Sequence, residues 1–328
     1  MKKFLALVLA LVMTMSLVTI AGAEDYTDAD SMNYAEAVEV MSAVGVVGGY
    51  ADGSFNPQAG LTRGAAAKII CNMILGPTTA EALNADAAPY SDVAVDNVFA
   101  GYIAYCAKEG IISGYADGTF RPAAPLTGYA FMKMLLGALG YDATIEGYVG
   151  SNWSINVAKR ALNIGLDKGL VSDFVGAKAL TREEACLYAF NTMKADMVQY
   201  DNNTSISVGD IEITTSTKAE VVNNATTNDK IWTAGDVTQF AEKYFSKLKF
   251  ENGMDAFGRP AITWWYGVKN DDNKVGQFVN KTPVATFEGI TSEKEVYAAV
   301  AGDGATETIA QIYEDGAEKD GYAYAKAV

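Results

Sequence analysis

The stretch Gly45-Val-Val-Gly-Gly-Tyr-Ala-Asp-Gly-Ser-Phe-Asn-Pro-Gln-Ala-Gly-Leu-Thr62 returns 65 residues later as Gly110-Ile-Ile-Ser-Gly-Tyr-Ala-Asp-Gly-Thr-Phe-Arg-Pro-Ala-Ala-Pro-Leu-Thr127. Eleven of the 18 positions are identical, and the alignment needs no gap. A repeat of this kind indicates one structural unit that is used more than once. Because so small a unit cannot bury its apolar face alone, we expect neighbouring units to pack together and share a core.

A third, degenerate copy follows the first two. Its Lys168-Gly-Leu-Val171 matches Glu109-Gly-Ile-Ile112, and its Leu180-Thr-Arg-Glu-Glu184 matches Leu61-Thr-Arg-Gly-Ala65. The loop between these two matches is about five residues shorter than in the other copies. We therefore divide this part of the chain into segment 1 (24–86), segment 2 (87–146) and segment 3 (147–198).

Each segment follows one plan, in which two helices are joined by a loop. Short openers, Tyr26-Thr-Asp28 and Tyr90-Ser-Asp92, begin segments 1 and 2. Apolar residues at three- and four-residue spacing then predict an amphipathic helix, which ends at a left-handed glycine. After the loop, a threonine caps the second helix. The expected helix-ending glycines are Gly45, Gly110 and Gly169, and the capping threonines are Thr62, Thr127 and Thr181, the last with Glu184 at the spacing of a capping box.

These features resemble the S-layer homology family. Its hallmarks are an opening aromatic-x-Asp, a Gly-Tyr-x-Asp-Gly-x-Phe-x-Pro loop, and a second helix that starts with Thr-Arg-Ala-Glu or a relative of it. Segments 1 and 2 carry the loop nearly letter for letter, whereas segment 3 keeps Thr181-Arg-Glu-Glu184 and has lost the loop. The resemblance covers roughly residues 24–198. It implies a mainly α fold in which the three repeats form a pseudo-threefold helical bundle.

The same resemblance implies a function. Family members bind non-covalently to a secondary cell-wall polymer, often a pyruvylated one, that is attached to peptidoglycan. An acidic group docks naturally at a helix N-terminus, where backbone N–H groups and the helix dipole point outward. An arginine directly after the capping threonine adds a two-pronged, charge-assisted contact. We therefore expect Arg63 with Thr62, and Arg182 with Thr181, to bind the polymer. Segment 2 has Gly128 instead, so at most two grooves are expected to be competent.

Other residues have two interpretations. Arg63 and Arg182 could be solvated residues of a first helical turn. Tyr50 and Tyr115 are expected to pack in the core and hold the loop to the helices, and either hydroxyl group could also reach a sugar. Trp153 suits either stacking on a sugar ring or core packing.

The loop's Asp-Gly pairs favour tight turns over calcium ligands. Glycine supplies the positive φ and aspartate bonds local amides, whereas a calcium loop needs several more oxygen ligands. The pairs are Asp52-Gly53 and Asp117-Gly118.

The N-terminal residues predict a secretory signal. Lys2 and Lys3 precede an apolar run from Phe4 to Ile20, and Ala21-Gly-Ala23 offers a small-x-small cleavage pattern. An uncleaved membrane anchor is the alternative, but the run is shorter than the ~20 residues that a spanning helix needs. Cleavage after residue 23 would give a secreted protein of the cell surface with no membrane contact.

Composition excludes several classes of function. The net charge is −15, which disfavours binding to nucleic acid. There is no histidine, so Ser/His/Asp and Cys/His nucleophile systems and the common zinc ligand sets are absent. Neither a metal nor a cofactor is expected. A carboxylate-pair hydrolase remains chemically possible, because it needs only Asp and Glu. Cys71, Cys106 and Cys186 are scattered through apolar stretches and are expected to be buried free thiols.

From about residue 199 the composition shifts toward Asn, Thr and Ser. Alternating pieces at 206–208 and 211–213, and the aromatic Trp264-Trp-Tyr266, predict a linker and a β-containing region over 199–328. Its role is open, and the chain could be part of a longer protein. The Trp-Trp-Tyr run suits a buried strand better than a carbohydrate platform.

Three functions compete. The first is non-enzymatic anchoring of an exported protein to the wall polymer. The second is a structural subunit that self-associates in a surface layer. The third is a wall-anchored enzyme that acts on glycans, which the lack of histidine disfavours.

Overall fold

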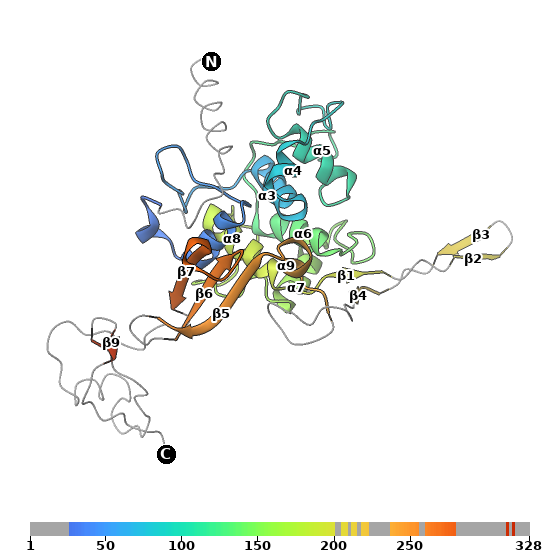
Figure 1. The fold of residues 1–328 in the computed structure, drawn as a ribbon. Coiled ribbons are helices and arrows are strands. Elements are labelled where there is room, and N and C mark those ends of the chain that lie inside the picture. Colours follow the sequence, from blue (N-terminus) through green and yellow to red (C-terminus); the bar gives the residue numbers. More distant parts are fainter. Residues whose placement is uncertain are drawn as a thin grey trace, which may run out of the picture. The chain divides into compact units, whose positions relative to one another are not determined.

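The computed structural model describes residues 26–200, 205–208, 211–214, 218–222, 237–255, 260–279, 313–314 and 317–318 (Figure 1). The expected signal sequence, residues 1–23, lies outside this set. The chain forms two compact units, Met1–Leu248 and Lys249–Val328. None of the helices in the described residues is both long enough and apolar enough to cross a membrane.

The first unit is mainly helical. Segment 1 supplies α2 (Ala35–Ala43), α3 (Arg63–Leu75) and the short α4 (Pro77–Glu81); segment 2 supplies α5 (Ala100–Lys108) and α6 (Gly128–Leu139); segment 3 supplies α7 (Trp153–Asn163) and α8 (Arg182–Met193). A last short helix, α9 (Phe240–Tyr244), packs against α3 and α8.

Strands follow the helices. In the first unit, β1 (Val198–Gln199) pairs with β4 (Glu220–Val221), and β2 (Ser205–Val208) pairs with β3 (Ile211–Thr214). A three-stranded sheet has the order β5 (Leu248–Met254), β6 (Pro260–Tyr266), β7 (Lys274–Val279), and β8 (Tyr313–Glu314) pairs with β9 (Ala317–Glu318). Strand β6 buries Trp264 completely. The expected mainly α fold with a β-containing C-terminal region is confirmed.

The second helix of each segment starts at the predicted threonine. The side-chain hydroxyl oxygens of Thr62, Thr127 and Thr181 accept hydrogen bonds from the N–H groups three residues ahead, at 3.2, 3.4 and 3.3 Å. In segment 3 the Glu184 carboxylate returns a bond to the Thr181 N–H, which completes the capping box. The cap predictions are confirmed.

The first helices of segments 1 and 2 end at the predicted glycines, with φ of 74° at Gly45 and 70° at Gly110. The prediction for segment 3 is wrong by four residues. Helix α7 ends before Gly165 (φ 77°), and the next N–H, that of Leu166, bonds the Ala161 carbonyl as a helix stop requires. Gly169 also has positive φ (90°) but lies in the following turn. The shortened loop of segment 3 misled the sequence alignment here.

The first helix of each segment packs against the second helix of a neighbouring segment. Helix α5 packs against α3, α7 against α6, and α2 against α8 (Figure 1). Segment 3 thus returns to segment 1, and the three pairs of helices form a closed cycle.

Backbone hydrogen bonds follow the same cycle. The Leu126 N–H donates to the Leu61 carbonyl at 2.9 Å, Leu180 donates to Leu126 at 2.8 Å, and Leu61 donates to Leu180 at 2.8 Å. All three leucines are buried. A buried N–H without a partner costs about 1–3 kcal/mol, so each segment needs the next one to complete its own backbone pairing.

In segments 1 and 2, the Gly-Tyr-Ala-Asp-Gly loop is held by the opener of its own segment. The Asp92 carboxylate accepts the N–H groups of Phe120 and Arg121, both at 2.7 Å. Arg121 has φ of 60°, a left-handed conformation that costs a non-glycine residue energy. Asp28 holds the equivalent residues of segment 1 at 2.8 Å. The opening aspartates therefore stabilise a strained bend.

Arginine side chains connect two of the segment junctions. The Arg182 side chain donates from Nε to the Phe55 carbonyl and from Nη2 to the Gly48 carbonyl, both at 2.9 Å. Only 7% of Arg182 is exposed. Its guanidinium carbon lies 4.8 Å from the centre of the Tyr50 ring. The alternative of a solvated first-turn residue is therefore wrong for Arg182, because the start of α8 packs into the loop of segment 1.

We predict that Arg182→Ala lowers the free energy of unfolding by about 2–4 kcal/mol, because it leaves the carbonyls of Phe55 and Gly48 without this donor. Arg121→Ala is the matched control: its ion pair with Asp117 is half-exposed, so its loss costs less than about 1 kcal/mol. Urea unfolding followed by circular dichroism measures both. Equal effects of the two changes would contradict the structural role of Arg182.

The opener aspartates predict a pH dependence. Burial by itself raises the pKa of Asp92, but the hydrogen bonds from Phe120 and Arg121 outweigh it and hold that pKa below its ordinary value. A lowered folded-state pKa means that the stabilisation is present above about pH 4 and is lost as the pH falls further. Asp92→Asn should lower the free energy of unfolding by about 1 kcal/mol at pH 7, and by less as the pH approaches the folded-state pKa of Asp92.

The control for this experiment is Asp96→Asn, an exposed aspartate of the same connection. The measurement is the unfolding free energy of both variants and the parent at pH 7 and pH 3. A difference between parent and Asp92→Asn that is equal at the two pH values would show that the carboxylate charge has no part in holding the loop.

Candidate functional site

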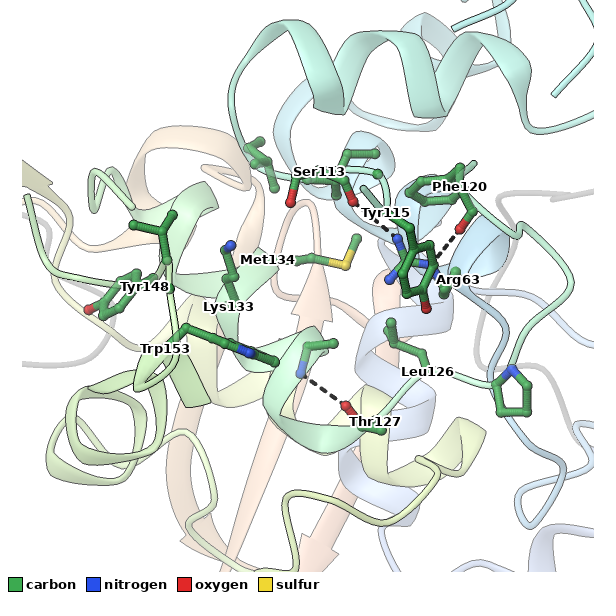
Figure 2. Close-up of a pocket in the computed structure, with 17 residues that line it drawn as sticks. Arg63, Ser113, Tyr115, Phe120, Leu126, Thr127, Lys133, Met134, Tyr148 and Trp153 are labelled. Carbon is green, nitrogen blue, oxygen red and sulfur yellow. Dashed lines mark hydrogen bonds between the residues drawn. The ribbon is translucent and has the colours of Figure 1, made fainter. Parts of the chain in front are cut away.

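A cavity of about 440 Å³ opens where the three segments meet (Figure 2). Segment 1 contributes Arg63 from the start of α3, and segment 2 contributes Tyr115 from the loop and Lys133 from α6. Segment 3 contributes Trp153 from the start of α7. Figure 2 shows Lys133 and Trp153 on the wall opposite Arg63 and Tyr115. Leu126, one of the three leucines joined by backbone hydrogen bonds, also lines the cavity.

Arg63 is fixed against the loop of segment 2. Its Nε donates to the Phe120 carbonyl at 2.8 Å and its Nη2 to the Ser113 carbonyl at 3.2 Å. The guanidinium carbon lies 4.3 Å from the centre of the Phe120 ring and 5.0 Å from that of Tyr115. Burial lowers the pKa of Arg63 from its ordinary value, but a guanidinium stays protonated at neutral pH. Arg63 also lines the cavity.

Tyr115 lies between two cations at the cavity rim. Its ring centre is 5.0 Å from the guanidinium carbon of Arg63 and 4.1 Å from that of Arg121. The residue is 41% exposed, so part of its side chain remains in contact with solvent. Such a tyrosine combines an apolar face with a polar tip, which suits a sugar.

Lys133 is a site residue that the sequence reasoning missed. It is half-buried, and its Nζ lies 5.8 Å from the centre of the Trp153 ring. Burial lowers the pKa of Lys133. No ion pair joins it to a carboxylate among the described residues. The repeat itself held the signal, because Lys68 and Lys133 both follow their capping threonine by six positions, whereas segment 3 has Leu187 there.

The structure separates the predicted binding residues into two groups. Arg63, Tyr115 and Trp153 line the cavity, whereas the Thr62 hydroxyl is used as a helix cap. Arg182, Thr181 and Tyr50 lie at the junction between segments 3 and 1, where Arg182 is buried.

The amides at the N-termini of the second helices, where an acidic group was expected to dock, already have acceptors within the chain. The N–H groups of Arg63, Gly128 and Arg182 donate to loop carbonyls of the next segment around the cycle. The residues that follow them do the same, and the third amide of each helix bonds the capping threonine. A ligand must therefore rely on side chains rather than on helix amides.

The loop residues Asp52 and Asp117 form tight turns. Each carboxylate accepts the N–H of the residue two positions ahead at 3.0 Å, and the intervening Gly53 and Gly118 have φ of 80° and 79°. Hydrogen bonds from the Thr119 hydroxyl and N–H and from the Arg121 guanidinium hold the pKa of Asp117 at about 2. Among the described residues, no three Cys, Asp or Glu side chains cluster as metal ligands would.

Segment 3 has a smaller counterpart of the cavity, with a volume of about 60 Å³. Gly128 occupies the position that Arg63 occupies in the larger cavity. The cation here, Lys178, lies 3.4 Å from the carboxylate of Glu184 and is paired with it. This cleft therefore has neither the volume nor the unpaired cation of the larger one.

Comparison with known proteins agrees with the motifs. The family model for the S-layer homology domain matches residues 25–67 and 89–128, which fall in segments 1 and 2. A surface layer protein of Brevibacillus choshinensis is 26% identical over 213 residues, which are 64% of this chain and 19% of that protein. The S-layer protein sap of Bacillus anthracis is 24% identical over 297 residues, which are 85% of this chain and 34% of that protein.

A third relative, an uncharacterized protein of Bacillus anthracis that is named a cell wall amidase, is 28% identical over 183 residues, or 53% of this chain and 34% of that protein. The chain thus spans about a fifth to a third of the length of these relatives. The family match and the relatives indicate a secreted protein of the cell surface. The two matched regions and the surface-layer relatives support the S-layer homology family for the helical part of this chain.

Proposed function

We propose that this chain anchors an exported protein to the bacterial cell wall by binding an anionic, pyruvylated secondary cell-wall polysaccharide in the 440 Å³ cavity. The observation that carries the proposal is the convergence of Arg63 and Lys133 on one cavity that also exposes Tyr115 and Trp153. Two cations from different segments meet there in a chain whose net charge is −15.

The chemistry of the cavity fits an acidic sugar. Lys133 has no carboxylate partner among the described residues and is partly desolvated, so an incoming carboxylate gains a strong charge-assisted bond. Arg63 faces it from the opposite wall and can hold a second oxygen. The rings of Tyr115 and Trp153 offer apolar faces to a pyranose. A sugar that carries a pyruvate ketal presents both a carboxylate for the two cations and a ring face for the two aromatic side chains.

We also propose that segments 1, 2 and 3 are three repeats arranged as a pseudo-threefold helical bundle, preceded by a signal sequence at 1–23 and followed by a region of separate role from 199. The cyclic packing of the helices and the ring of leucine hydrogen bonds support this arrangement. In segment 3 the threonine cap and the arginine after it survive, although its loop is shortened.

A structural role in a surface layer is the second candidate. The names of the relatives favour it, because most of the proteins matched are S-layer proteins. In this role, copies of the chain self-associate in addition to binding the wall. Electron microscopy of the purified chain separates the two: regular sheets favour the lattice subunit, whereas dispersed particles that still bind wall favour the anchor.

An enzymatic role is a third and weaker candidate, raised by the amidase among the relatives. The chain has no histidine, and the residues that line the cavity include no Asp, Glu or Cys. Incubation with purified wall, followed by assay of released amino groups and reducing sugars, tests it directly.

We predict that Lys133→Ala lowers the affinity for polymer-bearing wall sacculi about 10- to 100-fold, which corresponds to the loss of a charge-assisted contact of ~1.5–3 kcal/mol. The measurement is co-sedimentation of the chain with sacculi, before and after acid extraction of the polymer. Lys178→Ala is the matched control, since it removes one positive charge from the smaller cleft, and it should bind within about twofold of the parent. Parent-like binding by Lys133→Ala would exclude the cavity as the site.

Arg63→Ala is expected to lower both affinity and stability. The cavity loses a cation, and the carbonyls of Phe120 and Ser113 lose their donor. Thermal melting must therefore accompany the binding assay, which is read at a temperature where the variant remains folded. Gly128→Ala is a poor neutral control, because an added Cβ would lie 3.3 Å from the Gly176 backbone. If folded Arg63→Ala binds like the parent, the arginine serves the fold alone.

A further inference from the structure

Two cysteines from different segments meet in the core. Cys71 lies on α3 and Cys106 on α5, and their sulfur atoms are 3.5 Å apart. Both are fully buried. They are separated by 35 positions, and nothing in their spacing predicted that they would touch. In this structure the two sulfur atoms are not bonded to each other.

The local packing positions the pair closely. The Cys71 thiol also approaches the Tyr102 carbonyl at 3.6 Å, and the Cys106 thiol approaches the Ala67 carbonyl at 3.7 Å. Each sulfur thus points across the interface between α3 and α5. A disulfide needs about 2.05 Å between the sulfur atoms, so a closure of about 1.5 Å is required, which side-chain rotation with a small shift of one helix can supply.

We propose that Cys71 and Cys106 form a disulfide that joins segments 1 and 2 in the exported protein. The chain is a protein of the cell surface, where thiols are not kept reduced as they are in the cytosol. In the reaction two S–H bonds break and one S–S bond forms. The two protons and two electrons pass to an external disulfide, such as oxidised glutathione or the oxidised Cys-x-x-Cys of an exchange enzyme, which becomes two thiols.

The bond forms while the chain folds rather than afterwards. Thiol–disulfide exchange needs a thiolate at an accessible sulfur. In the folded chain the neighbouring Cys106 thiol and burial both raise the pKa of Cys71 well above its ordinary value, and neither sulfur is exposed. Oxidant therefore has to reach the pair before α5 closes onto α3. Once formed, the bond is shielded from reductant by the same burial.

The crosslink would lie at the junction that carries the proposed binding site. Helix α3 begins at Arg63, and α5 leads directly into the turn that contains Ser113. Arg63 also crosses this junction, with side-chain hydrogen bonds to the carbonyls of Phe120 and Ser113. A covalent link between α3 and α5 would add to these bonds on the side of the cavity that carries Arg63. The disulfide does not depend on what the cavity binds.

The test uses the chain from residue 24 to residue 328. It is unfolded with reductant, then refolded in either reduced or oxidised glutathione, and finally unfolded again with N-ethylmaleimide present. Intact mass counts the free thiols. After oxidative refolding we expect one maleimide adduct, on Cys186, and a Cys71–Cys106 peptide pair after proteolysis without reductant. After reductive refolding we expect three adducts.

Variants identify the partners. Cys186→Ala should show no maleimide adduct after oxidative refolding. Cys71→Ala should show two adducts, on Cys106 and Cys186. The oxidised parent should have the same circular dichroism spectrum as the reduced parent and a Tm higher by on the order of 5–10 °C, because the crosslink restricts the unfolded chain. Three adducts on oxidatively refolded, native protein, a crosslink that involves Cys186, or an oxidised form with a non-native spectrum would each overturn the proposal.

Discussion

The ring of backbone hydrogen bonds among Leu61, Leu126 and Leu180 is the constraint on which the helical part of this protein depends. Each leucine sits between the loop of its segment and the cap of its second helix. Its N–H and carbonyl are buried and must be paired. Because the acceptor of each belongs to another segment, no segment can complete its own core. The three segments therefore pack in a closed cycle, with segment 3 against segment 1, rather than as a linear array.

That closure also decides where a ligand can bind. The amides at the helix N-termini, which would attract an acid in an isolated helix, are used to bond neighbouring loops. Arg182 is used in the same way and is almost inaccessible. At the junction of segments 1 and 2, an arginine both holds the loop and faces a cavity, with Lys133 opposite it. The three junctions share one backbone plan and differ in side chains, so a symmetric framework carries an asymmetric surface.

Much of this could be predicted from the sequence, because the determining interactions are local. Threonine caps, glycine stops and Asp-Gly turns depend on residues a few positions apart, and the 65-residue repeat located them. The helix stop of segment 3 was misplaced at Gly169 because the shortened loop of this segment leaves few residues to align with the other two copies. Lys133 was missed because its importance comes from Trp153 of another segment. The meeting of Cys71 with Cys106 was invisible for the same reason. Contacts between segments depend on the closed cycle, which no local pattern encodes.

The return of segment 3 to segment 1 has a mechanical consequence. A surface protein held at one end and dragged at the other is loaded along its chain. In a linear array of repeats, tension would open one junction after another, each at the force that a single junction withstands. Here a pull on the end of α8 is resisted together by the loop of segment 1, through Arg182, and by segment 2, through the Leu180 amide. Bonds loaded side by side share the force, so the closed cycle yields at a higher tension than the same contacts strung in series.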